Sequence, residues 1–244
     1  MADEGGIEVP GLGGGGLAWL SRGSTHEFLS GVGEGVPAIA WLSALAASAV
    51  RSLHTGGDTV AWVGRRVWPT PWVIAASGLE CAAMLLVDVD GTDERMWAAD
   101  QGLRAGVVVV ADGSGFDMAA SRRLALAAEA GGSVGFFARP STEEKTLTAA
   151  CSRWRVRPVV TSHPRAAWRV ERIRCRASPL SVDEPPAWVL EWALESERGG
   201  WPGMTFRGVA DEESVRMVGG SDGTEPQAGD GGVAGGMGDR PCAA

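Results

Sequence analysis

Short apolar runs alternate with longer segments of helical pattern between residues 25 and 140. The expected strands are 59–64, 83–89, 107–111 and 133–138. The expected helices are 36–53, 93–104 and 117–130. Continuous apolar strands separated by helices are typical of a parallel sheet that helices cover on both faces. The sequence therefore predicts an α/β fold with a mostly parallel central sheet.

The pattern changes after Pro140. A short helix is expected over Thr142 to Ala150, followed by three strands without intervening helices. These strands are expected at 151–157, 166–175 and 187–195. Apolar and polar residues alternate along them with period two, as in half-buried antiparallel strands. We therefore expect the sheet to continue into an antiparallel C-terminal extension.

Both ends of the chain are rich in glycine. Residues 1–23 are expected to form a flexible arm, and 24–198 a single domain. The tail, 199–244, holds many glycines and few aliphatic residues, so it is expected to be largely disordered.

Composition limits the classes of site and partner. The chain has 244 residues and a net charge of −8, which does not favour binding to polyanions by bulk charge. Its cysteines and histidines are scattered, so neither a metal site nor a disulfide framework is expected. The longest apolar helix, 36–50, is too short to span a membrane. The start of the chain is acidic rather than basic, and a cytoplasmic protein without membrane contact is expected.

The segment 30–37 has the outline of a phosphate-binding loop. A working loop reads G-x-x-x-x-G-K-[ST] between a strand and a helix, and its backbone N–H groups cradle phosphates. The positions concerned are Ser30, Gly31, Gly33, Gly35, Val36 and Pro37. Val36 replaces the lysine and Pro37 replaces the magnesium-binding hydroxyl, so the loop lacks its phosphate-neutralising groups. The alternative is a glycine-rich turn that leads into a helix with Pro37 in its first turn.

Asp112 follows the apolar run 107–111 about 75 residues after this loop. In P-loop ATPases an acid at such a strand end helps to hold magnesium. The alternative is a core strand followed by an ordinary turn. The order of loop, intervening strand and helix, and acidic strand end is the one that a RecA-type core requires.

Several segments resemble a known family. Residues 25–29 leading into the loop, 91–106, 116–129 and 135–140 are similar to ImuA-type proteins, which are RecA-like accessory factors of bacterial damage-induced mutagenesis. This group is related to SulA-like proteins. The resemblance covers about 24–198 and implies a three-layer RecA-like P-loop fold.

The resemblance implies a role rather than a reaction. ImuA-like proteins work beside a polymerase-like protein and an error-prone DNA polymerase, contact RecA, and support translesion synthesis. Because the loop is degenerate, we expect no ATPase activity, no cofactor and no catalytic residues, which leaves a non-catalytic adaptor. One alternative is weak ATP or ADP binding by the amides of Gly33 to Val36, and another is a SulA-like inhibitor of cell division. Self-association is common among RecA relatives.

Arginines recur on the last expected strands. Six of them alternate with apolar residues: Arg153, Arg155, Arg157, Arg172, Arg174 and Arg176. If these two strands pair, six guanidinium groups are expected on one surface, where they would bind DNA phosphates or an acidic partner. The alternative is internal pairing, with Glu191 and Glu195 on a neighbouring strand.

Overall fold

The structure is a computed structural model. It describes residues 6–7, 20–31, 39–53, 58–160, 166–176, 187–195, 203–209 and 216–217. The helices are α1 (Ile39–Leu53), α2 (Pro71–Ser77), α3 (Thr92–Arg104) and α4 (Met118–Gly131). Three 3-10 turns are η1 (Arg65–Val67), η2 (Cys81–Ala83) and η3 (Ser141–Glu143).

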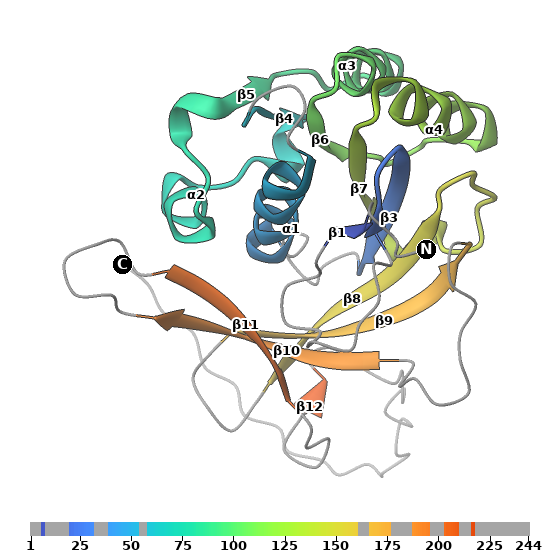
Figure 1. The fold of residues 1–244 in the computed structure, drawn as a ribbon. Coiled ribbons are helices and arrows are strands. Elements are labelled where there is room, and N and C mark those ends of the chain that lie inside the picture. Colours follow the sequence, from blue (N-terminus) through green and yellow to red (C-terminus); the bar gives the residue numbers. More distant parts are fainter. Residues whose placement is uncertain are drawn as a thin grey trace, which may run out of the picture.

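A ten-stranded sheet forms the centre of the molecule, in the order β11-β10-β9-β8-β3-β7-β6-β4-β5, with β12 paired to β8 (Figure 1). Its first strands are β3 (Ser24–Ser30), β4 (Val60–Val63), β5 (Met84–Val87), β6 (Val108–Asp112), β7 (Val134–Pro140) and β8 (Ser152–Val160). The later strands are β9 (Ala167–Cys175), β10 (Ala187–Glu195), β11 (Gly203–Val209) and β12 (Arg216–Met217).

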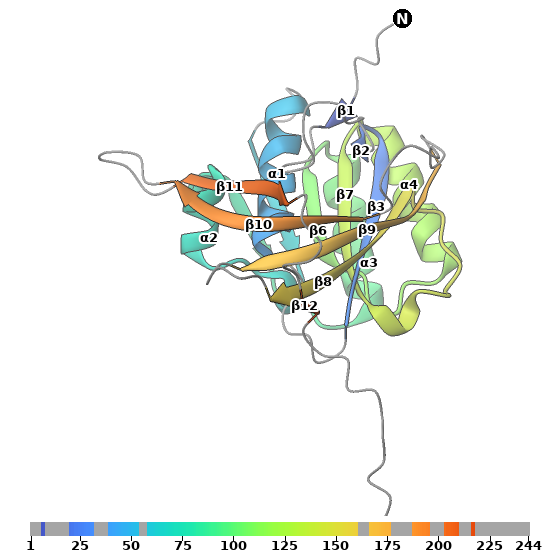
Figure 2. The same cartoon turned by 90° about the horizontal axis from the view of Figure 1, so that it is seen from below.

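Strands β3 to β8 pair in parallel, and β9, β10, β11 and β12 add to them in antiparallel pairs. The predicted α/β class, with a parallel centre and an antiparallel C-terminal extension, is confirmed. In Figure 2 strands β10 and β11 extend away from α4 toward the side of α2.

Helices pack on both faces of the parallel strands (Figure 1). Side chains of α1 and α2 share one apolar cluster with β3, β4 and β8, and side chains of α3 and α4 share another with β6 and β7. Helix α1 is buried on nearly every side. Trp41 of α1 packs against Trp154 of β8, which in turn contacts Trp188 of β10, so the antiparallel strands also cover this helix. A helix that is apolar all round requires such enclosure.

Helix α2 lies outside the predicted helices. The Thr70 hydroxyl accepts a hydrogen bond from Val73 N at 3.4 Å and caps the helix, and Pro71 occupies its first turn. Gly78 then ends it with a left-handed backbone, φ 79°. The local start and stop signals are complete, although the helix is short.

The helix expected over Thr142 to Ala150 is wrong, because only the 3-10 turn η3 forms there. Arg153 donates hydrogen bonds to the carbonyls of Glu144 and Thr146, which would accept intrahelical bonds in such a helix. Arg174 donates to the carbonyls of Thr148 and Ala150 at the end of the segment. Side chains of the sheet thus supply hydrogen bonds to this segment.

The ends of the chain join the domain more closely than expected. Strands β1 (Gly6–Ile7) and β2 (Leu20–Ser21) pair within the predicted arm, and Ile7 and Leu20 are buried in the core beside α1. Strand β11 pairs with β10 beyond the predicted boundary at 198. Apart from residues 22–23 and β12, the rest of both end segments lies outside the described residues. In the described part of the chain, no helix has the length and apolar character needed to cross a membrane.

Candidate functional site

The two described positions of the predicted phosphate loop, Ser30 and Gly31, lie at the carboxyl edge of the parallel strands. Strand β3 ends at Ser30, Gly31 follows it, and α1 begins at Ile39. Strand β6 ends at Asp112 and is separated from β3 by β7 alone. Because these strands are parallel, Ser30 and Asp112 reach the same edge, where α/β proteins commonly bind ligands. The other loop positions, Gly33, Gly35, Val36 and Pro37, lie outside the described residues.

Asp112 is buried and fully engaged by protein groups. Its Oδ2 atom lies 2.9 Å from Arg95 Nη1, and its Oδ1 atom accepts hydrogen bonds from Ser114 N at 3.0 Å and Ser114 Oγ at 2.5 Å. Arg95 also donates to the carbonyls of Asp112 and Ser114, and its guanidinium lies 5.9 Å from the centre of the Phe116 ring. A metal ion at Asp112 would have to displace a buried cation. The sequence marked Asp112 but not Arg95, which follows three exposed residues at the start of α3.

A second buried ion-pair cluster surrounds Glu27 of β3. Its Oε1 atom accepts from Arg139 Nη1 and Thr148 Oγ1, both at 2.8 Å. Its Oε2 atom accepts from Arg153 Nε at 2.8 Å and Nη2 at 2.5 Å. Arg139 also pairs with Glu143 at 2.6 Å. Arg153 is therefore an internal partner of Glu27 and not part of an exposed basic surface.

The predicted surface of six arginines does not form. A register shift between Arg153 and Trp154 places Arg174 opposite Arg153, but Arg172 opposite Trp154. Such a bulge changes which face the later residues occupy, so Arg172 is 2% exposed on the Trp154 face. Of the predicted set, the exposed members are Arg157, Arg174 and Arg176.

Carboxylates neutralise much of the remaining charge on these strands. Glu171 takes the position opposite Arg155 and accepts from it at 2.6 Å, and Glu144 pairs with the same guanidinium. The hydrogen bond from Arg155 to Glu144 is the main reason that the pKa of Arg155 is raised above its usual value. The alternative of internal pairing therefore holds for Arg153 and Arg155. Their partners are Glu27, Glu144 and Glu171 rather than the expected Glu191 and Glu195.

His26 lies in a buried chain of hydroxyl groups that the sequence did not reveal. Its Nε2 atom is 2.8 Å from Ser24 Oγ, and its Nδ1 atom is 2.7 Å from Ser152 Oγ, which also accepts from Trp154 Nε1. Ser24 Oγ donates to the Ser21 carbonyl at 2.6 Å. Complete burial lowers the pKa of His26 to about 3. The ring is therefore neutral near pH 7 and enclosed, which suits a structural role rather than general base catalysis.

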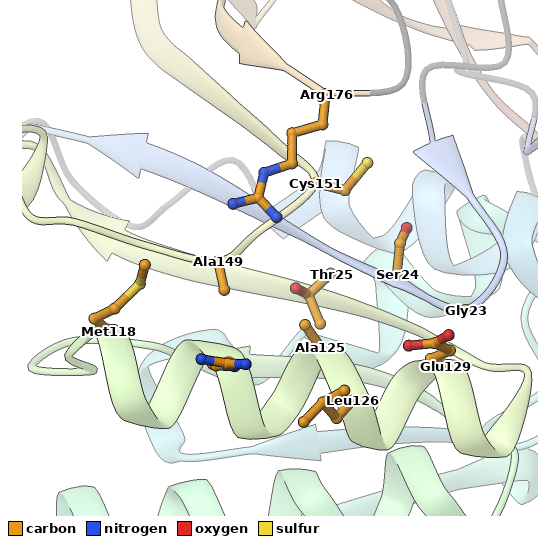
Figure 3. A pocket seen from close by; sticks show the side chains of 11 residues that line it. Gly23, Ser24, Thr25, Met118, Ala125, Leu126, Glu129, Ala149, Cys151 and Arg176 are labelled. Atoms are coloured by element: carbon orange, nitrogen blue, oxygen red, sulfur yellow. The ribbon is translucent and has the colours of Figure 1, made fainter.

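A groove of about 520 Å³ opens between α4 and the beginning of β3 (Figure 3). Its lining residues are Gly23, Ser24, Thr25, Met118, Arg122, Ala125, Leu126, Glu129, Ala149, Cys151 and Arg176. The Arg176 side chain extends from the end of β9 toward α4 (Figure 3). Sequence reasoning missed this groove because its walls come from distant parts of the chain. Among the described residues there is no cluster of three or more metal-ligating side chains.

Comparison with known proteins agrees with the resemblance noted from the sequence. Over 218 residues the chain is 29% identical to protein ImuA of Caulobacter vibrioides, in strains NA1000 and CB 15 alike. The chain is similar to ImuA. The match spans 80% of this chain and 84% of the ImuA protein, so the likeness includes both the parallel and the antiparallel strands. No protein-family model matches the chain.

Proposed function

We propose that this ImuA-like chain is a non-catalytic adaptor in damage-induced mutagenesis, in which it supports translesion DNA synthesis by binding other proteins. The main support is the state of Asp112, whose carboxylate pairs with the buried Arg95 at 2.9 Å. The acid that would hold magnesium in a P-loop ATPase is thus already neutralised by the protein itself. This pairing supports a site without phosphoryl transfer.

The order of strands and helices nevertheless supports a common origin with nucleotide-binding P-loop proteins. Strand β3 leads through the glycine-rich segment into α1, and Asp112 ends a parallel strand at the same edge. We infer a three-layer RecA-like P-loop fold in which Val36 and Pro37 have replaced the lysine and the hydroxyl. Because fold and activity are separable, the fold can remain as a binding scaffold after phosphoryl transfer is lost.

The partners proposed are a polymerase-like mutagenesis protein, an error-prone DNA polymerase and RecA. The purified chain is expected to capture the polymerase-like protein of the same organism. Deletion of the gene that encodes the ImuA-like chain is expected to abolish damage-induced mutations. An unchanged mutation frequency in the deletion strain would refute the proposal. Arrest of cell division on overexpression, without an effect on mutagenesis, would favour the SulA-like alternative instead.

Nucleotide titration tests the proposal that the chain does not use ATP. With a fluorescent ADP or ATP analogue and Mg²⁺, we expect no saturable binding up to about 1 mM. This limit corresponds to a binding free energy weaker than about 4 kcal/mol. The Asp112→Asn variant, which keeps an acceptor for Ser114, serves as the matched control. Magnesium-dependent binding that the wild type shows and this variant loses would establish the weak nucleotide-binding alternative.

A further inference from the structure

The outward face of α4 forms the floor of the groove. Its outward side chains recur at intervals of four residues, at Met118, Arg122 and Leu126, as neighbours on one helix face do. Met118 and Leu126 are 45% and 54% exposed. From Met118 to Glu129 the helix rises about 16 Å, the length of about five residues of an extended chain. The groove therefore has the dimensions of a binding site for a short peptide.

Positive charge is concentrated along one part of this groove. Arg122 and Arg176 are exposed, and within the described residues neither guanidinium has a carboxylate partner. The pKa of the adjacent Arg174 is lowered, first by partial burial and then by the nearby charges of Arg176 and Arg153. Of the described side chains that line the groove, Glu129 alone is acidic, and it lies at one end of α4 (Figure 3). An anionic group beside Arg176 would reduce its repulsion of Arg174.

We propose that the groove binds a short extended segment of a partner protein, in which apolar side chains flank an aspartate or glutamate. This inference rests on the proposed adaptor function and names the surface and the chemistry of the partner. Apolar side chains of the bound segment cover Met118 and Leu126, and the burial of this exposed hydrocarbon stabilises the complex. The acidic side chain accepts charge-assisted hydrogen bonds from Arg122 and Arg176. Glu129 repels a second acid at its end of the groove and so sets the direction of the segment.

The lining favours a peptide over a nucleic acid. Grooves that hold single strands combine basic residues with aromatic side chains on which bases stack. The described lining here includes Ala125, Ala149 and Leu126 but no aromatic side chain, and it includes the carboxylate of Glu129. Stacking platforms are thus missing from the described part of this groove, whereas anchors for aliphatic side chains are present.

The test is selection of a displayed library of random seven-residue peptides on the full-length chain. We expect the enriched peptides to share an acidic residue next to apolar ones. Synthesised with a fluorescent label, these peptides are expected to bind the Arg122→Glu and Leu126→Asp variants at least tenfold more weakly than the wild type. Arg51→Glu, an exposed arginine in the last turn of α1, is the matched control and should bind equally well. Thermal melting of each variant verifies folding, since all three positions are exposed.

Several outcomes would overturn the inference. No enrichment, enriched peptides without acids, or equal binding by both groove variants would remove the groove as a peptide site. Displacement of the peptide by residues 219–244 of this chain as a synthetic peptide would assign the groove to its own tail, and displacement by an oligothymidylate would assign it to nucleic acid. Capture of the polymerase-like protein by wild type and Arg122→Glu alike would leave the adaptor function intact while refuting this surface.

Discussion

Replacing Glu27 by alanine is expected to lower the free energy of unfolding by about 3–5 kcal/mol, the usual cost of removing one partner from a buried ion pair. The carboxylate holds two arginines at once, Arg139 and Arg153, and all three side chains are nearly inaccessible to solvent. Without Glu27, Arg153 loses its carboxylate partner, while Arg139 keeps Glu143 and the Phe116 carbonyl. Urea denaturation at pH 7, with the midpoint and slope compared between variants, measures the loss.

Two control variants separate charge from shape. Glu27→Gln keeps the volume and one acceptor oxygen, so a loss similar to that of alanine would show that the negative charge is what matters. Asp88→Ala removes the exposed pair between Arg65 and Asp88, which has two hydrogen bonds of 2.6 Å. Because exposed ion pairs contribute little, this change should be far smaller. Equal effects of Asp88→Ala and Glu27→Ala would contradict the assignment of Glu27 as a central element of the fold.

The strands could be predicted from the sequence, whereas the Glu27 cluster could not. Strand β10 begins and ends at the predicted residues, and β4 to β9 lie within a few residues of their predicted positions, because apolar runs and period-two patterns are local signals. The ion pairs join β3 to residues more than a hundred positions later in the chain. Local patterns contain no information about such partners.

The register shift between β8 and β9 explains why the arginine surface was predicted incorrectly. The sequence alternates arginine with apolar residues on both strands, and this pattern implies a shared face for all six. One irregular position between Arg153 and Trp154 moves Arg172 to the opposite face of the sheet. Ser30 and Asp112 lie at one edge because parallel strands fix that edge irrespective of register. The partner of Asp112, Arg95, depends on helix packing and was not predictable.

Acidification is expected to destabilise the fold through His26. Burial lowers the pKa of this ring from 6.5 to about 3 in the folded protein, whereas the unfolded chain binds the proton near the ordinary value. Between these two values the unfolded state holds more protons, so stability is fully present above pH 6.5 and falls as the pH decreases toward 3. The contribution is about 1.4 kcal/mol per pH unit, so the loss from pH 6.5 to 4.5 is about 2–3 kcal/mol.

Paired denaturation curves at pH 7 and pH 4.5 isolate this contribution from that of the carboxylates. His26→Gln removes the titrating group, so its loss between the two pH values should be smaller than that of the wild type by about 2–3 kcal/mol. Ser24→Ala removes one hydrogen-bond partner of the His26 ring, but the ring stays buried on β3 beside β8. This variant should therefore keep the wild-type pH dependence. If His26→Gln and the wild type lose equal stability on acidification, the imidazole is accessible to protons in the folded state. The chain of hydroxyl groups around it would then be open to solvent.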